Sequence, residues 1–310
     1  MPANLQKPTY GIGEWYGQSF VELDAAQRLA LADQAIRHCE QSDSTPDGQR
    51  VEPACPFARQ PVATCTKKGG VCSIRLYEKD DHGVARPAQG AAGSLITTCP
   101  TRYQQRDTIY REIGKHLLND DDPTVLGEVP FLKKLGTEST DEGVGKIDNV
   151  LVSDMSADLT WCAVEVQAVY FSGKKMQLLF EHIRTFERDG LPFPDRRRGP
   201  DWRSSGAKRL LPQLQTKVPT LRRWGKKMAV VVDTLWYANN VGAAPTTDDL
   251  SNCDIVWFVF GFNETTSGYE LKLDAVHMQE LEATGPALVG GTPVTRTEFE
   301  NKLRESMHRP

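Results

Sequence analysis

Residues 145–173 read GKIDNVLVSDMSADLTWCAVEVQAVYFSG, and the prediction of the fold rests on this stretch. Two mainly apolar runs, 146–152 and 161–171, flank a short segment rich in Ser and Asp, which is typical of two strands joined by a polar turn. Side chains alternate between the two faces of a strand, so Glu165 and Gln167 project to one face. The Val and Ala residues around them project to the other face, toward a core.

Acidic residues on this pair of strands predict a catalytic site. Asp148 lies on the first strand, and pairing of the two strands would bring it close to Glu165. Two carboxylates, with the polar Gln167 two residues further on, suit a hard divalent cation held over a scissile phosphate. Carboxylates on neighbouring strands are also common on a solvated face. Here Glu165 and Gln167 interrupt an apolar run, where a buried charge is costly unless something compensates it, and a metal ion would do so.

Segments with apolar alternation or continuous apolar runs predict further strands at 125–133, 228–236, 254–262 and 269–278. Amphipathic spacing predicts helices at 23–38, 103–118, 174–188, 206–224 and, exposed at the end of the chain, 297–307. The aromatic-rich segment 11–20 is expected to be irregular. The pattern therefore predicts an α/β protein.

Length and composition place the chain among globular proteins. The 310 residues, 39% of them hydrophobic, suffice for one large α/β domain or a domain with an appended module. The opening residues, MPANLQKPTY, lack the apolar segment of a signal peptide, and no apolar run reaches the length of a membrane span. We therefore expect a cytoplasmic protein without a membrane partner.

The distribution of charge indicates a polyanionic partner. The chain carries −4 overall, yet residues 196–227 contain eleven Arg and Lys against one acidic residue, Asp201. Such asymmetry is typical of nucleic-acid binding, although a solvated basic helix face would look the same. Arg suits bidentate contacts with guanine, so a GC-rich site is favoured. The candidate contacts to double-stranded DNA are Arg196, Arg197, Arg198, Arg203, Lys208 and Arg209.

Four of the seven cysteines predict a metal site. Cys55, Cys65, Cys72 and Cys99 lie in a segment rich in Gly, Pro and Lys that has little apolar area of its own. The turns CPF, KKGGVC and TCP resemble the tight knuckles on which thiolates bind a tetrahedral metal ion. Iron and zinc both accept four thiolates, and the spacing does not separate them. We expect a small metal-binding module with the first helix in residues 1–102, and a catalytic, DNA-binding domain in residues 103–310.

Several of these blocks together resemble the NotI-type type II restriction endonucleases, a family of the PD-(D/E)XK nuclease superfamily. The resemblance runs from about residue 55 to residue 262. It rests on the four cysteine blocks, on Asp148, on the sequence Glu-Val-Gln at 165–167, on the GP…KR stretch at 199–209 and on the strand IVWFVF.

The resemblance implies a mixed sheet flanked by helices and a homodimer that cleaves a palindromic duplex site with Mg²⁺. It implies catalytic positions at Asp148, Glu165 and Gln167, with Asp148 and Glu165 as Mg²⁺ ligands. It also implies that the four cysteines bind iron, and that a cognate DNA methyltransferase protects the host. The superfamily commonly has Lys where this chain has Gln167, so we expect Gln167 to orient the attacking water. Glu128 is a further possible ligand of Mg²⁺, or an exposed strand carboxylate.

Other functions are compatible with parts of this pattern. A metal-stabilised, non-catalytic DNA-binding protein would account for the basic segment and the cysteines, but not for Asp148, Glu165 and Gln167. A structure-specific repair nuclease of the same superfamily would use the same carboxylates without a fixed recognition sequence. An inactive relative is disfavoured, because the catalytic positions carry no lesion.

Overall fold

The computed structural model describes residues 7–40, 53–59, 63–134, 136, 145–154, 159–172, 176–194, 198–266, 268–291 and 294–307, apart from the side chains of residues 154 and 172. Two of the predicted DNA contacts, Arg196 and Arg197, lie outside these residues.

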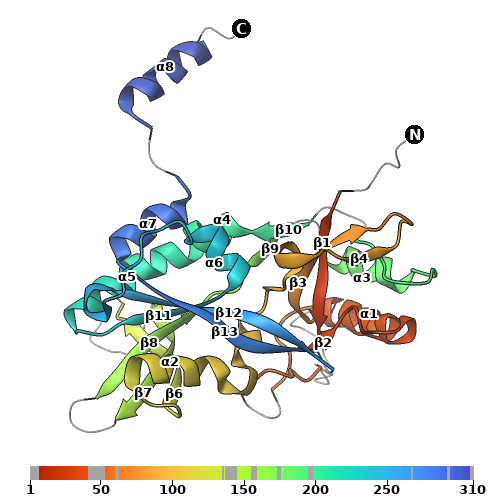
Figure 1. The fold of residues 1–310 in the computed structure, drawn as a ribbon, viewed down its shortest axis with the longest axis horizontal. Helices are drawn as coiled ribbons and strands as arrows, with labels where there is room; N and C mark the ends of the chain where they lie inside the picture. Colours follow the sequence, from red (N-terminus) through yellow and green to blue (C-terminus); the bar gives the residue numbers. More distant parts are fainter. Residues whose placement is uncertain are drawn as a thin grey trace.

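A mixed sheet forms the centre of the molecule (Figure 1). Over the described residues it has six strands in the order β13-β12-β11-β8-β7-β6. β11 runs parallel to both β8 and β12, and the other neighbouring pairs are antiparallel. The strands are β6 (Thr124–Leu132), β7 (Gly145–Asp154), β8 (Thr160–Val166), β11 (Met228–Asp233), β12 (Ile255–Thr265) and β13 (Gly268–Gln279). The predicted α/β class with a central mixed sheet is confirmed.

β11 lies between β12 and β8 in the middle of the sheet, and every one of its residues is buried. Met228, Val230 and Val232 face one side of the sheet, and Ala229 and Val231 face the other, so the strand belongs to two separate apolar cores. This is the pattern expected for a parallel strand covered on both faces. Its parallel neighbours, β8 and β12, carry the same kind of alternation.

Helices cover both faces of the sheet (Figure 1). α2 (Thr108–Leu118) packs on one face through Ile109, Tyr110 and Ile113. The other face is covered by α5 (Leu211–Arg223), α6 (Thr234–Asn240) and α7 (Leu281–Val289). A short helix, α4 (Trp202–Ser205), and a π-helical turn, η3 (Gly206–Leu210), lead into α5. The predicted helix at 206–224 is therefore divided between η3 and α5.

A second sheet lies beside the central one and is built from the N-terminal part of the chain. Its strand order is β2-β1-β3-β4, with β5 also paired to β3. The strands are β1 (Thr9–Trp15), β2 (Gln18–Ser19), β3 (Val71–Lys79), β4 (Ala85–Pro87) and β5 (Ile96–Thr97). The expectation that 11–20 is irregular is wrong, because most of this segment forms β1 and β2. β1 pairs with β3, which lies about sixty residues further along the chain. Local sequence does not reveal a partner at that separation.

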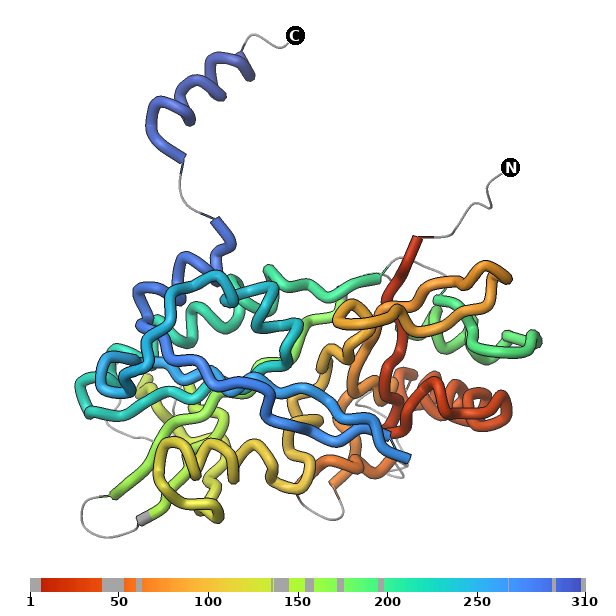
Figure 2. Tube along the Cα trace, viewed as in Figure 1, coloured from red at the N-terminus to blue at the C-terminus, as the bar shows by residue number. Residues whose placement is uncertain are grey.

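Two helices and two helical turns complete this half of the molecule. α1 (Ala25–Glu40) and α3 (Gln177–Arg184) pack against each other beside β1 and β3 (Figure 2). The turns are η1 (Gly90–Gly93) and η2 (Pro100–Asp107). The predicted helix at 103–118 begins as η2 and becomes α2 after Arg106 and Asp107, both of which have positive φ.

The remaining elements are short or lie at the C-terminal end. β9 (Tyr170–Ser172) pairs with β10 (Gly199–Asp201), and η4 (Leu250–Asn252) precedes β12. α8 (Arg296–Met307) has no buried residue and stands clear of the body, as Figure 2 shows. None of the helices within the described ranges is long and apolar enough to cross a membrane.

Candidate active site

The register of β7 and β8 brings Asp148 and Glu165 together. Asn149 pairs with Val164, which places Asp148 beside Glu165 in the ladder. The backbone N–H of Asp148 donates to Oε1 of Glu165 across 3.4 Å, and the N–H of Val166 donates to Oδ2 of Asp148 at 3.0 Å. The Asp148 side chain is exposed, whereas Glu165 is 2% exposed. One carboxylate therefore faces solvent and its neighbour lies in the protein interior.

Burial perturbs the Glu165 carboxyl strongly. Desolvation and, after it, the nearby negative charge of Asp148 raise its pKa to about 7. The ammonium of Lys217 acts in the opposite direction but does not offset the rise. Two carboxylates placed together at the end of a buried strand repel each other, and a bound cation would relieve that repulsion. Perturbed carboxyls of this kind are concentrated at functional sites.

Lys217 is a residue of this site that the sequence analysis missed. Its Nζ donates to Oε1 of Glu165 at 2.5 Å and to Oε1 of Gln213 at 2.9 Å. The side chain comes from α5 and is 4% exposed. The signal was present in the helix pattern, because Lys217 falls on the apolar stripe with Leu214 and Val218. A lysine at a core-facing helix position needs a buried partner, and Glu165 is that partner.

Gln167 follows directly after β8 and continues the parallel pairing with β11. Its N–H donates to the carbonyl of Val231 at 2.9 Å, and its side-chain Nε2 donates to the carbonyl of Ala168 at 2.6 Å. The amide is thus engaged by neighbouring backbone rather than by either carboxylate. A role for Gln167 in orienting the attacking water stays a prediction.

Glu128 lies on β6, beside β7 and level with Asp148, and forms an ion pair with Lys146. It has a positive φ of 51°, its side chain is 78% exposed, and it accepts a hydrogen bond from Lys146 at 2.8 Å. That hydrogen bond lowers the pKa of Glu128. Across the described residues, no group of three or more His, Cys, Asp and Glu side chains is placed to hold a metal ion. Glu128 as an additional ligand therefore stays a prediction.

The described part of the basic segment presents three of the predicted DNA contacts at the surface. Arg203, Lys208 and Arg209 are exposed along α4 and η3, and the guanidinium of Arg209 lies 4.7 Å from the centre of the Tyr170 ring. Arg198, by contrast, is buried, so its guanidinium does not lie on the surface of the DNA-free protein. The exposed members lead directly into α5, which carries Lys217.

Close packing fixes the start of this helical segment. The side chain of Asp201 accepts a hydrogen bond from the N–H of Ser204 at 2.9 Å and caps α4. Gly206 lies so close to α6 that a Cβ atom there would stand 2.5 Å from Oδ1 of Asn240. A larger residue at this position would have to displace the Asn240 side chain, so glycine permits the close approach of η3 to α6.

A family model for the restriction endonuclease NotI matches residues 44–273, which covers both carboxylates, Lys217 and the basic segment. The chain belongs to the NotI restriction endonuclease family. It is therefore assigned to the site-specific endonucleases, which bind and cleave double-stranded DNA. No curated protein sequence matched the chain.

The four cysteines of this NotI-family chain lie as two backbone-linked pairs. The N–H of Cys55 bonds to the Ala63 carbonyl and that of Cys65 to the Pro53 carbonyl, while the N–H of Cys99 bonds to the carbonyl of Cys72 at 3.3 Å. All four are free thiols. Burial raises the pKa of Cys65 to about 11, and the pKa of Cys72 lies well above its usual range for the same reason.

The structure does not support the expected metal site on these cysteines. They are the right kind of ligand for iron or zinc, and their backbones are neighbours. Over the part of the chain that the structure describes, however, no three of them converge as a metal-coordinating group. The metal-binding module therefore stays a prediction, and the structure shows β3 and β5 with their loops in this region. Cys162 and Cys253 are buried, as expected for small core residues.

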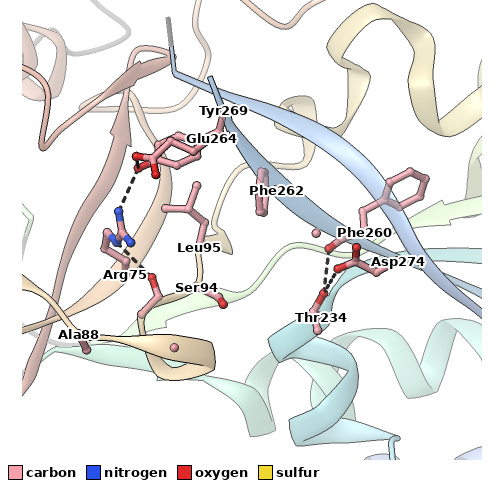
Figure 3. Close-up of a pocket in the computed structure, with 13 residues that line it drawn as sticks. Arg75, Ala88, Ser94, Leu95, Thr234, Phe260, Phe262, Glu264, Tyr269 and Asp274 are labelled. Carbon is pink, nitrogen blue, oxygen red and sulfur yellow. Dashed lines mark hydrogen bonds between the residues drawn. The ribbon is translucent and has the colours of Figure 1, made fainter. Parts of the chain in front are cut away.

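A separate cavity of 320 Å³ lies where the N-terminal sheet meets β12 and β13 (Figure 3). On one side of it Arg75 donates to the hydroxyl of Tyr269 at 2.9 Å, and on the other side Thr234 donates to Asp274 at 3.1 Å. Neither carboxylate of the candidate site lines this cavity. The cavity is thus distinct from the site on β7, β8 and α5.

Proposed function

We propose that this protein is a type II restriction endonuclease that hydrolyses phosphodiester bonds of double-stranded DNA in a reaction that depends on Mg²⁺. One observation carries the proposal: a buried carboxylate, Glu165, stands against a second carboxylate, Asp148, at the end of β8. This supports a PD-(D/E)XK catalytic core, in which such a pair comes from two adjoining strands. The exposed basic residues on α4 and η3, just before α5, support a duplex substrate.

The donor set suits Mg²⁺. Magnesium favours hard oxygen ligands, and proteins often hold it through one or two carboxylates together with substrate phosphate and water. Asp148 and Glu165 would supply the two carboxylates, so a third protein ligand is not required. When bound, the ion would activate water and neutralise charge on the reacting phosphate.

The protein's own groups would prepare this site before substrate arrives. The N–H of Val166 fixes one oxygen of Asp148, and Lys217 fixes one oxygen of Glu165. Both hydrogen bonds that described residues give to Glu165 go to Oε1, which leaves Oε2 to face a ligand. Carboxylates held in this way need little reorganisation when substrate binds, and such preorganisation is a large part of enzymatic rate enhancement.

Recognition would use the exposed basic residues. Arg203, Lys208 and Arg209 would contact the phosphate backbone or the guanine edges, and their chemistry supports a GC-rich site. A palindromic site is read most simply by two copies related by a two-fold axis, so we propose a homodimer. A cognate methyltransferase would be needed, because the same sequence occurs in the host genome.

We also propose that the chain has two functional regions. Residues 1–102 hold the first helix and the four cysteines, and residues 103–310 form the catalytic, DNA-binding domain.

The decisive experiment is digestion of unmethylated phage DNA and high-GC genomic DNA by the purified protein, with Mg²⁺ and with EDTA. Discrete fragments that form only with Mg²⁺ would establish a restriction endonuclease, and sequencing of the fragment ends would give the site. Tight duplex binding without any cleavage would favour the non-catalytic DNA-binding protein. Cleavage confined to nicked, branched or mismatched DNA would favour a structure-specific nuclease.

A further inference from the structure

A polar stripe runs along one face of the helical segment from the surface to the two carboxylates. Gln213 and Lys217 are four residues apart on α5 and lie one above the other, joined by a hydrogen bond of 2.9 Å, and Arg209 precedes them in the π-helical turn η3. Burial increases along the chain: Arg209 is exposed, Gln213 is half-buried and Lys217 is buried. The stripe spans roughly 12 Å along the axis. It joins the surface expected to meet DNA with the interior position of Glu165.

The end of the stripe places a cation where the strand itself supplies none. The strand position two residues after Glu165 is the uncharged Gln167, whose amide is bound to the Ala168 carbonyl. Lys217 instead reaches Glu165 from the helix that covers this face, at 2.5 Å. An ammonium group has three N–H donors. Among the described residues, Glu165 and Gln213 each accept a hydrogen bond from Lys217, and the third donor is left for a further acceptor.

We propose that Lys217 is a catalytic residue of this nuclease, delivered by α5, which donates to an oxygen of the reacting phosphate. The inference rests on the proposed function and deepens it. Negative charge on the phosphate oxygens increases as the attacking oxygen adds, and a fixed cationic donor stabilises that charge more than the ground state. Gln213 would hold the ammonium in place, and Arg209 would hold the adjoining backbone.

The stripe also explains why a lysine is tolerated at a core-facing position. A buried ammonium without a partner is strongly unfavourable, so a purely structural helix would carry Leu or Met beside Leu214 and Val218. A buried ion pair is on its own weak evidence for stability. Its position against a proposed metal ligand therefore favours a role in the reaction.

The test compares Lys217→Met with Lys217→Arg, Gln167→Met and the matched control Lys115→Met. Lys115 is an exposed lysine on α2, paired with Glu112, so its replacement removes the same charge away from the site. Three quantities are measured: single-turnover cleavage with Mg²⁺, duplex binding with Ca²⁺ in place of Mg²⁺, and binding of Mn²⁺ followed by the electron paramagnetic resonance of the free ion.

We expect Lys217→Met to slow cleavage by about 100-fold, the usual effect of losing one donor to a developing oxyanion. Duplex binding should be unchanged, and Mn²⁺ should bind as tightly as before or more tightly, because a neighbouring cation has been removed. Lys217→Arg should recover part of the cleavage rate, and Gln167→Met should reduce the rate less than Lys217→Met does. Lys115→Met should equal the parent protein in all three measurements.

Cleavage by Lys217→Met at the parent rate would overturn the inference. So would a rate loss that is matched by an equal loss of Mn²⁺ affinity, since that would assign Lys217 a purely structural role at Glu165. If Lys217→Met does not fold, Gln213→Leu replaces it: we expect slower cleavage with unchanged Mn²⁺ affinity, and the parent rate would overturn the inference. Absence of cleavage by the parent protein and by Lys115→Met would instead refute the proposed function itself.

Discussion

Nε of Arg102 donates to both carboxylate oxygens of Glu14, at 2.9 and 2.8 Å, and neither side chain is exposed to solvent. The pair joins β1 of the N-terminal sheet to η2, the turn that leads into α2. A second nitrogen of the same guanidinium, Nη2, donates to the carbonyl of Tyr269 at 2.8 Å, at the start of β13. Arg102 therefore connects the N-terminal sheet with the central sheet that carries the candidate site.

Replacing Arg102 by Met should destabilise the protein by about 3–5 kcal/mol, because Glu14 would be left buried without its charge partner. Chemical denaturation followed by fluorescence would measure the loss. The double variant with Glu14→Leu is the control: removing both charges should cost clearly less than the sum of the two single changes. Additive losses would mean that the two residues do not stabilise one another.

Asp148→Asn and Glu165→Gln should each abolish cleavage and leave duplex binding largely intact. Both substitutions keep the size of the side chain while removing a proposed ligand of Mg²⁺, and the exposed basic residues lie on α4 and η3 rather than on β7 or β8. Cleavage assays with Mg²⁺ and binding assays with Ca²⁺ would separate the two activities. A comparable loss of binding in both variants would contradict this separation of functions.

Duplex binding should weaken steeply as salt is raised, because each neutralised phosphate releases condensed counterions. Changing Arg203, Lys208 or Arg209 to Gln should reduce the slope of log affinity against log salt by about 1 for each phosphate that the variant no longer neutralises. Arg222→Gln is the matched control from the same basic segment, because its guanidinium is already bound by Asp254 and Glu282. If all three variants showed the same slope of log affinity against log salt as the parent protein, this surface would not contact the DNA.

The strand pair that carries Asp148 and Glu165 was predictable because its information is local. Alternation places Glu165 and Val164 on opposite faces, and two runs so close in sequence are expected to pair; the structure pairs β7 with β8 and packs Val164 in the core. β12 and most of β11 were predictable for the same reason, since each is one continuous apolar run; the end of the strand predicted at 228–236 is instead the start of α6, which Asp233 caps.

Features that depend on contacts far apart in the chain were not predicted. Lys217 meets Glu165 across 52 residues, and the partner of a single polar residue on an apolar helix face cannot be read from the helix alone. The glycine-containing strand β1 was mistaken for irregular chain because β3, its partner, lies beyond α1. For the four cysteines, residue type and turn chemistry indicated ligands, but the directions of their side chains depend on how β3, β5 and the preceding loops pack.

Asp233 provides a prediction of pH dependence that is independent of catalysis. It is fully buried, and desolvation raises its pKa to about 6, even though the backbone N–H groups of Trp236 and Thr97 donate to it. Between the ordinary pKa of an Asp and about 6, the folded state therefore holds a proton that the unfolded state has released. Stability from this group is greatest below that interval, falls as pH rises through it and is constant above it.

Asp233→Asn does not ionise, so its stability relative to the parent should improve by roughly 1 kcal/mol between about pH 5 and about pH 7.5. Loss of one hydrogen-bond acceptor adds a cost that is the same at every pH, and other titrating groups cancel in the comparison of the two proteins. Urea unfolding at both pH values would measure the difference. Asp249→Asn is the control, because hydrogen bonds from Ser251 lower the pKa of Asp249 and keep it ionised throughout this range. A stability difference between Asp233→Asn and the parent that stays constant from pH 5 to pH 7.5 would show that the buried carboxyl is already ionised at pH 5.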